Sequence, residues 1–185
     1  MPIPYKVSSE ITELGTAGFI KVEEKSGFYR GALFLIDCRG EPVEFTYTDI
    51  RIPNTFLWNK NEIARGATRR IITSLFGLCP QVPRLILCLG TEITAKTFCE
   101  DIETSIPVCR VVESGKECCP HEREKILVDP QNPQLRLVWC PEIPIPGTAG
   151  NKLFYRLSNS GLLVEPFQRI TRGLIEVYDK PDVNE

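Results

Sequence analysis

The stretch with the clearest potential for chemistry is ESGKECCPHEREK, residues 113–125, in which Cys118 and Cys119 precede Pro120 and His121. His121 is the only histidine among the 185 residues. Thiolates and imidazole nitrogens are ligands that zinc prefers, and a thiol beside an imidazole can also be a nucleophile with its general base. The stretch is therefore open to three interpretations: a metal site, a catalytic pair, or a polar loop.

The spacing of these residues favours the polar loop. Structural zinc sites use ligand pairs two to four residues apart, and no C-x-x-C occurs in the chain. A tetrahedral site around Cys119 and His121 would need Cys109 or Cys140 from neighbouring strands. Residues adjacent in sequence seldom reach the geometry of a nucleophile and its base, and the mixed charges nearby would not activate a thiol. We therefore assign no catalytic, metal-binding or cofactor-binding residue.

The other cysteines fit core packing. Cys88 and Cys140 lie in apolar runs, Cys109 follows the sequence IPV, and Cys99 lies next to Phe98. Free cysteine is among the most buried residue types. The N-terminus does not read as a signal peptide and no apolar run is long enough to span a bilayer, so we expect reduced thiols, no membrane and a cytoplasmic location.

Residues 59–77 carry the one clear charge asymmetry, in which the cations outnumber Glu62. Arg65 and Arg69 are four residues apart on a helix and repel each other by a few tenths of a kcal/mol. An acidic partner, a phosphate backbone or acids of the same domain would relieve that repulsion. Trp58, just before the helix, could lie at a contact surface or fix the start of the helix. The candidate binding residues are Trp58, Arg65, Arg69 and Arg70.

The composition is that of an ordinary globular domain. Hydrophobic residues make up 42% and charged residues 25% of the chain, and a formal net charge of −2 provides no global field for nucleic acid. We expect one α+β domain over residues 1–185, with a possible sub-boundary near the loop 113–134.

The first half of the chain predicts an antiparallel β-meander packed with one or two helices. Strands are expected at 16–24, 28–37 and 43–52, the third from the alternation of Val43, Phe45 and Tyr47 with polar residues. Residues 59–77 predict an amphipathic helix, since apolar residues recur at every fourth position from Ile63 to Leu75.

The second half predicts a mixed central segment and a C-terminal hairpin. Strands are expected at 84–90, 105–113 and 134–140, with a short helix within 91–103. The strand–helix–strand unit over 84–113 could be parallel. Residues 152–167 predict a hairpin around SNSG, and residues 168–178 predict a final helix or strand.

These features favour a small intracellular, non-catalytic protein-interaction or accessory subunit, of the kind found in prokaryotic regulatory or defence operons. The expected partner is another protein or a larger complex, contacted through IPNTFLW (52–58) or PEIPIPG (141–147). A nucleic-acid-binding accessory protein that uses the helix 59–77 is a less favoured alternative. A zinc- or thiol-dependent protein centred on the Cys118–His121 loop is the third.

Overall fold

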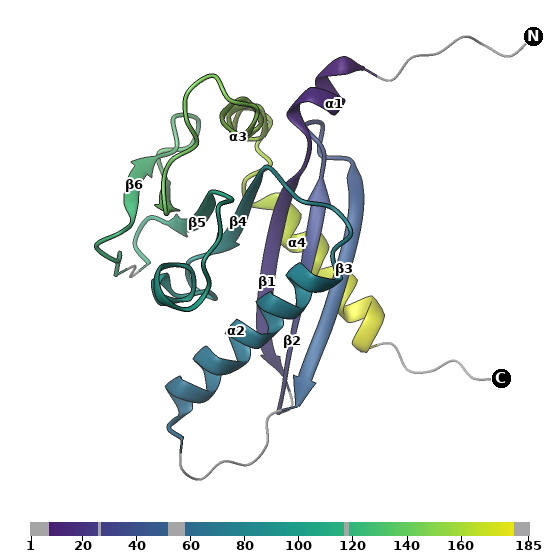
Figure 1. The fold of residues 1–185 in the computed structure, drawn as a ribbon, viewed down its shortest axis with the longest axis vertical. Coiled ribbons are helices and arrows are strands. Elements are labelled where there is room, and N and C mark those ends of the chain that lie inside the picture. The colour runs from purple at the N-terminus through teal and green to yellow at the C-terminus, as the bar shows by residue number, and fades with distance from the viewer. Residues whose placement is uncertain (1–7, 26, 52–57, 117–118, 180–185) are drawn as a thin grey trace, which may run out of the picture.

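A seven-stranded mixed sheet forms the centre of the computed structural model, which describes residues 8–25, 27–51, 58–116 and 119–179. The strand order is β3-β2-β1-β4-β5-β7-β6, and helices cover both faces of the sheet (Figure 1). The predicted α+β class is confirmed.

The meander predicted for the first half is present. β1 (Ala17–Lys25), β2 (Phe28–Ile36) and β3 (Pro42–Arg51) pair antiparallel, and α2 (Lys60–Leu78) crosses them. Gly31 lies at the crossing, where an added Cβ would be 2.5 Å from Cγ2 of Ile71 and 2.8 Å from the carbonyl oxygen of Lys21. Glycine there allows α2 to lie close to the sheet.

The second half adds the strands that define the site. β4 (Leu85–Leu89) pairs parallel to β1, and β5 (Val108–Glu113) pairs parallel to β4, so the predicted parallel unit over 84–113 is confirmed. β7 (Leu135–Cys140) is antiparallel to β5, and β6 (Lys125–Val128) forms the edge. β1, β4 and β5 therefore end at the same edge of the sheet, which is where ligands bind in open sheets of this kind.

Two apolar clusters hold the layers together. On the α2 face, Ile71, Ile72 and Leu75 pack on Ile20 and Cys88. The opposite face is covered by α1 (Ser9–Leu14), α3 (Ala149–Asn159) and α4 (Glu165–Tyr178), with the ring of Phe167 edge-on to that of Phe19 at 5.3 Å. Because successive side chains of β1 point to opposite faces, Phe19 packs under α4 and Ile20 packs under α2.

The predicted C-terminal hairpin is wrong, because residues 149–178 form α3 and α4. Leu153, Phe154 and Leu157 are buried at helical spacing, and the Thr148 hydroxyl accepts a hydrogen bond from the Asn151 backbone N–H to begin α3. Gly161, at φ 70°, allows the tight turn between the two helices.

Three further elements differ from the expectation or extend it. The short helix expected within 91–103 contains a five-residue π-helix, η1 (Thr97–Asp101). β6 and α1 were not predicted, since all four residues of β6 are exposed and α1 has only six residues. Among the described residues, no helix is long and apolar enough to cross a membrane.

Candidate functional site

A cleft of about 930 Å³ opens beside the start of α2, at the end of the sheet where β1, β4 and β5 terminate. We call it the α2 cleft. Its walls come from the first turns of α2, the segment 94–96 and the loop 119–121. The lining residues are Asn59, Lys60, Asn61, Glu62, Arg65, Thr94, Ala95, Lys96, Cys119, Pro120 and His121. The fold therefore brings together Arg65 and the Cys119–His121 loop, which the sequence treated as separate candidates.

The start of α2 is fixed by a capping box. The Asn59 side-chain oxygen accepts a hydrogen bond from the Glu62 backbone N–H at 3.0 Å, and a Glu62 carboxylate oxygen accepts one from the Asn59 backbone N–H at 3.0 Å. Two of the free N–H groups at the helix end are thereby satisfied. The box holds the lysine and arginine of the first turns in place along the cleft.

Arg65 is held by two acids of η1. Its Nε and one terminal nitrogen each donate to Asp101 at 2.7 Å, and the same terminal nitrogen donates to Glu100 at 2.8 Å. The hydrogen bond from Arg65 is the main reason that the pKa of Asp101 lies below its usual value. Acids of the same domain thus relieve the repulsion between Arg65 and Arg69, one of the alternatives that the sequence left open.

His121 faces the same acidic pair. Its Nε2 is 3.4 Å from Oε1 of Glu100, and its Nδ1 accepts a hydrogen bond from the Arg123 backbone N–H at 3.2 Å. Cys119 is exposed, whereas Cys118 lies outside the described residues. Among the described residues there is no group of three or more His, Cys, Asp or Glu side chains that could hold a metal ion. The described part of this loop therefore gives no support to a zinc site.

The remaining predicted binding residues flank the α2 cleft. Trp58 is 52% exposed, and its ring lies beside Gly66, where an added Cβ would be 3.5 Å away. Arg69 and Arg70 are exposed on the next turn of α2. An aromatic ring and two cations thus lie on the surface next to the cleft.

A buried ion pair ties the wall of the cleft to the sheet. Arg110 of β5 donates two hydrogen bonds to Glu124, both at 2.7 Å, and the two side chains are 4% and 1% exposed. The same carboxylate accepts a hydrogen bond from the His121 backbone N–H at 2.8 Å. The loop 119–124 is therefore positioned by a bidentate, charge-assisted contact.

Lys21, in the middle of β1, and Glu92, just after the end of β4, form an ion pair that was not predicted from the sequence. Their side chains are only 12% and 21% exposed. Burial raises the pKa of the Glu92 carboxyl above its usual value, while Lys21 acts in the opposite direction. One signal of this ion pair was present in the sequence. Lys21 lies two residues after Phe19 and therefore on the same face of β1 as Ala17 and Phe19, which are in the core.

A second set of charges joins β1, β2 and the end of α4. Arg30, buried beneath α4, donates to Glu23 at 2.6 Å and to Asp179 at 2.9 and 3.1 Å. The hydrogen bonds from Arg30 and Lys25 lower the pKa of Asp179 to about 2. These contacts satisfy the buried guanidinium and attach the last turn of α4 to the sheet.

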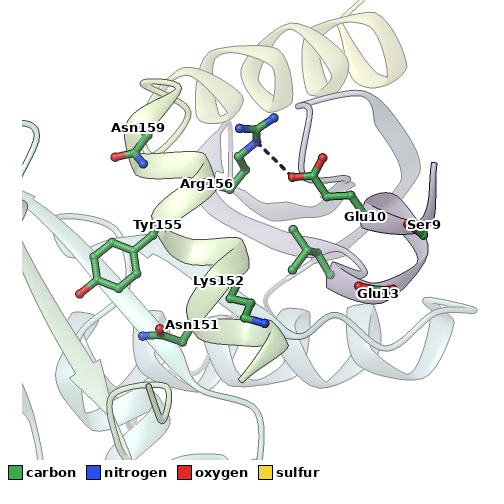
Figure 2. Close-up of a pocket in the computed structure, with 9 residues that line it drawn as sticks. Ser9, Glu10, Glu13, Asn151, Lys152, Tyr155, Arg156 and Asn159 are labelled. Atoms are coloured by element: carbon green, nitrogen blue, oxygen red, sulfur yellow. Dashed lines mark ion pairs between the residues drawn. The ribbon is translucent and has the colours of Figure 1, made fainter. Parts of the chain in front are cut away.

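A smaller hollow, of about 470 Å³, lies between α1 and α3 (Figure 2). Glu10 of α1 and Arg156 of α3 form an ion pair across it at 3.7 Å. Both side chains are about half exposed, so the pair contributes at most about 1 kcal/mol. This hollow lies beyond the start of β1, at the end of the sheet away from the α2 cleft.

The fold resembles that of two solved endonuclease V proteins. One, from Streptomyces avermitilis, superposes with a TM-score of 0.56 at 13% identity, over 88% of this chain and 82% of that chain. The other, from Bacillus subtilis, gives a TM-score of 0.51 at 12% identity, over 89% and 81%. At such identities the likeness shows the fold. No family model matches the chain, and no curated protein matches it in sequence.

This finding corrects the expected function. The sequence favoured a non-catalytic protein-interaction or accessory subunit, whereas the two solved proteins named above, which share this fold, are endonuclease V proteins. The non-catalytic role was expected because the sequence contains no recognisable catalytic motif. A fold shared at 13% identity leaves too little sequence in common for any motif to be read from this chain alone.

Proposed function

We propose that this chain acts on nucleic acid and that a strand binds in the α2 cleft. The observation that carries the proposal is the endonuclease V fold, matched over most of both chains. Ligands in sheets with parallel strands bind outside the carboxyl ends of those strands, which is where the α2 cleft opens. We also propose that the chain works in the cytoplasm.

The chemistry of the cleft suits a phosphate backbone. Lys60 and Lys96 are exposed in its lining, and Arg69 and Arg70 extend the positive charge along α2. Cations of this kind bind phosphates through the release of counterions, so affinity falls as salt rises. The local charge answers the objection raised by the net charge of −2, which describes the whole chain.

Trp58 adds a surface for a base. Stacking of an unpaired base on an aromatic ring contributes about 1–3 kcal/mol by alanine substitution and tolerates any sequence. The exposed indole lies at the start of the helix that lines the cleft. A single strand can place a base on this ring while its phosphates contact the lysines, so single strands should bind more tightly than duplex.

Cleavage of the bound strand is a second candidate, favoured by the fold alone. Two-metal nucleases hold their ions between several carboxylates. The described residues do not fit such a centre, since they contain no group of three potential ligands and Glu92 is already paired with Lys21. The proposal therefore includes no metal-dependent step.

Fluorescence anisotropy tests the proposal directly. Labelled DNA and RNA strands of about 20 nucleotides and the matched DNA duplex are titrated between about 50 and 300 mM salt. Lys60→Gln and Lys96→Gln should each weaken binding and flatten the salt dependence by about 0.7–0.9 per lost contact. Trp58→Ala should weaken single-strand binding by about fivefold to 150-fold, the equivalent of 1–3 kcal/mol.

Lys152→Gln, on α3 beside the hollow in Figure 2, is the matched control and should bind as the parent does. The proposal is rejected if every strand binds more weakly than about 100 µM at the lowest salt. It is also rejected if the control loses as much affinity as the cleft variants.

The second candidate, cleavage, is tested by the length of the strands in the same samples with and without Mg²⁺. Shortened strands would support the second candidate, and strands that stay intact under both conditions would reject it.

A further inference from the structure

Two buried thiols meet behind the α2 cleft. The Sγ atoms of Cys99 in η1 and Cys140 at the end of β7 are 3.1 Å apart, and the two residues are 5% and 3% exposed. Cys140 also donates to the Phe98 carbonyl at 3.3 Å. A disulfide has its sulfurs about 2.04 Å apart, so an approach of about 1 Å would join them.

Neighbouring thiols in the sheet do not offer the same geometry. Cys88 and Cys109 lie on the adjacent strands β4 and β5, but Cys88 belongs to the apolar cluster under α2 and Cys109 to the cluster under α3 and α4. Side chains on opposite faces of a sheet cannot be bridged without moving the backbone. Proximity alone therefore distinguishes Cys99 and Cys140.

η1 connects this pair to the wall of the cleft. The π-helix turns Cys99 into the core while the next two residues, Glu100 and Asp101, face Arg65 and His121. A side chain of the cleft loop also reaches the pair, because Arg123 donates to the Cys99 carbonyl at 3.0 Å. A movement of Cys99 toward β7 would be transmitted to Glu100 and hence to His121.

We propose that Cys99 and Cys140 form a redox-responsive dithiol that a small-molecule disulfide oxidises, and that closing the bond shifts η1 and the cleft wall. The thiolate of one cysteine attacks the small disulfide, forming a mixed disulfide and releasing one small thiol. The second cysteine then attacks the protein-bound sulfur and releases the other. In total the protein loses two electrons and two protons, and one disulfide becomes two thiols.

The reaction should be slow at neutral pH. Burial, the hydrogen bond with Cys140 and the nearby Glu124 raise the pKa of Cys99 to about 12, against a smaller effect of Arg110. The attacking species is the thiolate, whose fraction grows about tenfold per pH unit below that value. Attack also requires η1 to open locally, because both thiols are buried. The exposed Cys119 needs no such opening and should react faster than Cys99.

Mass spectrometry of the folded full-length chain tests bond formation. After incubation with oxidised glutathione, denaturation and alkylation, Cys99 and Cys140 should both escape alkylation and appear in one peptide that links them, whatever glutathione the exposed Cys119 has taken up. Cys99→Ser and Cys140→Ser should each abolish the link. Cys79→Ser, a half-buried thiol outside the pair, should form it as the parent does, with circular dichroism to confirm that each variant is folded.

Proton NMR tests the movement without any nucleic acid. The chain has one histidine, so its ring signals belong to His121 and should shift on oxidation in the parent but not in Cys99→Ser. No Cys99–Cys140 link in the parent chain, or a disulfide that joins either cysteine to a different protein thiol, would overturn the dithiol. A link that leaves the His121 signals unmoved would overturn the coupling to the cleft. Neither result depends on whether the chain binds nucleic acid.

Discussion

Replacing Glu124 with alanine gives a demanding test of how the cleft wall is held. Glu124 receives two hydrogen bonds from Arg110 and one from the His121 backbone, and its side chain is 1% exposed. Alanine removes both acceptor oxygens and so all three hydrogen bonds at once. The Arg110 guanidinium, itself only 4% exposed, then loses its two hydrogen bonds to Glu124 in the interior of the domain.

The expected cost is large for one side chain. Removing one member of a buried ion pair typically destabilises a protein by about 3–5 kcal/mol, because the other charge stays desolvated. Domains are stable by only about 5–15 kcal/mol, so Glu124→Ala should remove a substantial share. For a domain of this size, that loss corresponds to a fall in Tm of about 6–20 °C.

Urea unfolding, followed by circular dichroism, measures the free energy directly. Glu124→Gln should cost less than alanine, since an amide still accepts from Arg110. Arg110→Met combined with Glu124→Leu should recover much of the loss, because it removes both charges of the buried pair together. Glu142→Ala is the matched control: its exposed side chain lies 3.7 Å from Lys125, and its loss should change stability by less than about 0.5 kcal/mol.

A loss below about 1 kcal/mol for Glu124→Ala, at an unchanged slope against urea, would refute the reasoning. It would mean that water reaches Arg110 in the variant. An equal loss for Glu142→Ala would refute it as well, since burial would then not be the cause.

Three other predictions follow from local features. Asp179 has a pKa of about 2 when folded, below the usual value near 4. The stability from its contact with Arg30 is therefore present above about pH 4 and is lost as the pH falls toward 2. In acid unfolding, Asp179→Asn should lack this pH-dependent loss of stability. Gly31→Ala should destabilise by about 1–3 kcal/mol through overpacking. Gly66→Ala, where the added Cβ would make an ordinary contact with the Trp58 ring at 3.5 Å, should be neutral or stabilising by up to about 1 kcal/mol, and thermal unfolding measures both. Cys119 should be alkylated well before the buried thiols in a timed reaction read by mass, and equal rates would contradict the assigned burial.

Local patterns were sufficient for the first half of the fold. The first two strands followed from apolar runs bounded by turn residues, and the helix at 59–77 followed from apolar residues at every fourth position. The alternation of Val43 and Tyr47 with polar residues placed the third strand, although these two side chains are exposed and Thr46 between them is buried. The C-terminal error had a specific cause. Only the second half of SNSG forms the turn, since Ser158 and Asn159 still belong to α3, and turn residues do not decide which elements they join. The helical spacing of Leu153, Phe154 and Leu157 was present and outweighed by that signal.

The site could be predicted only in pieces. Arg65 and His121 were both singled out, but their meeting depends on η1, whose acids pair with both. Lys21 and Glu92 come together because β1 and β4 pair in parallel, a long-range choice that sequence patterns do not encode. The relation to the endonuclease V fold was likewise beyond reach, since it is expressed in the path of the chain and not in shared motifs.

The two faces of the sheet are covered at very different times during synthesis. α2 follows the meander closely, so one side can be shielded as soon as residue 78 leaves the ribosome. The other side waits for α3 and α4, which end near residue 178. At about 5–20 residues per second, a bare apolar surface around Phe19 and Phe34 persists for about 5–20 s in each nascent chain. Chaperone capture during translation should therefore concentrate on this surface and end when the last helix emerges.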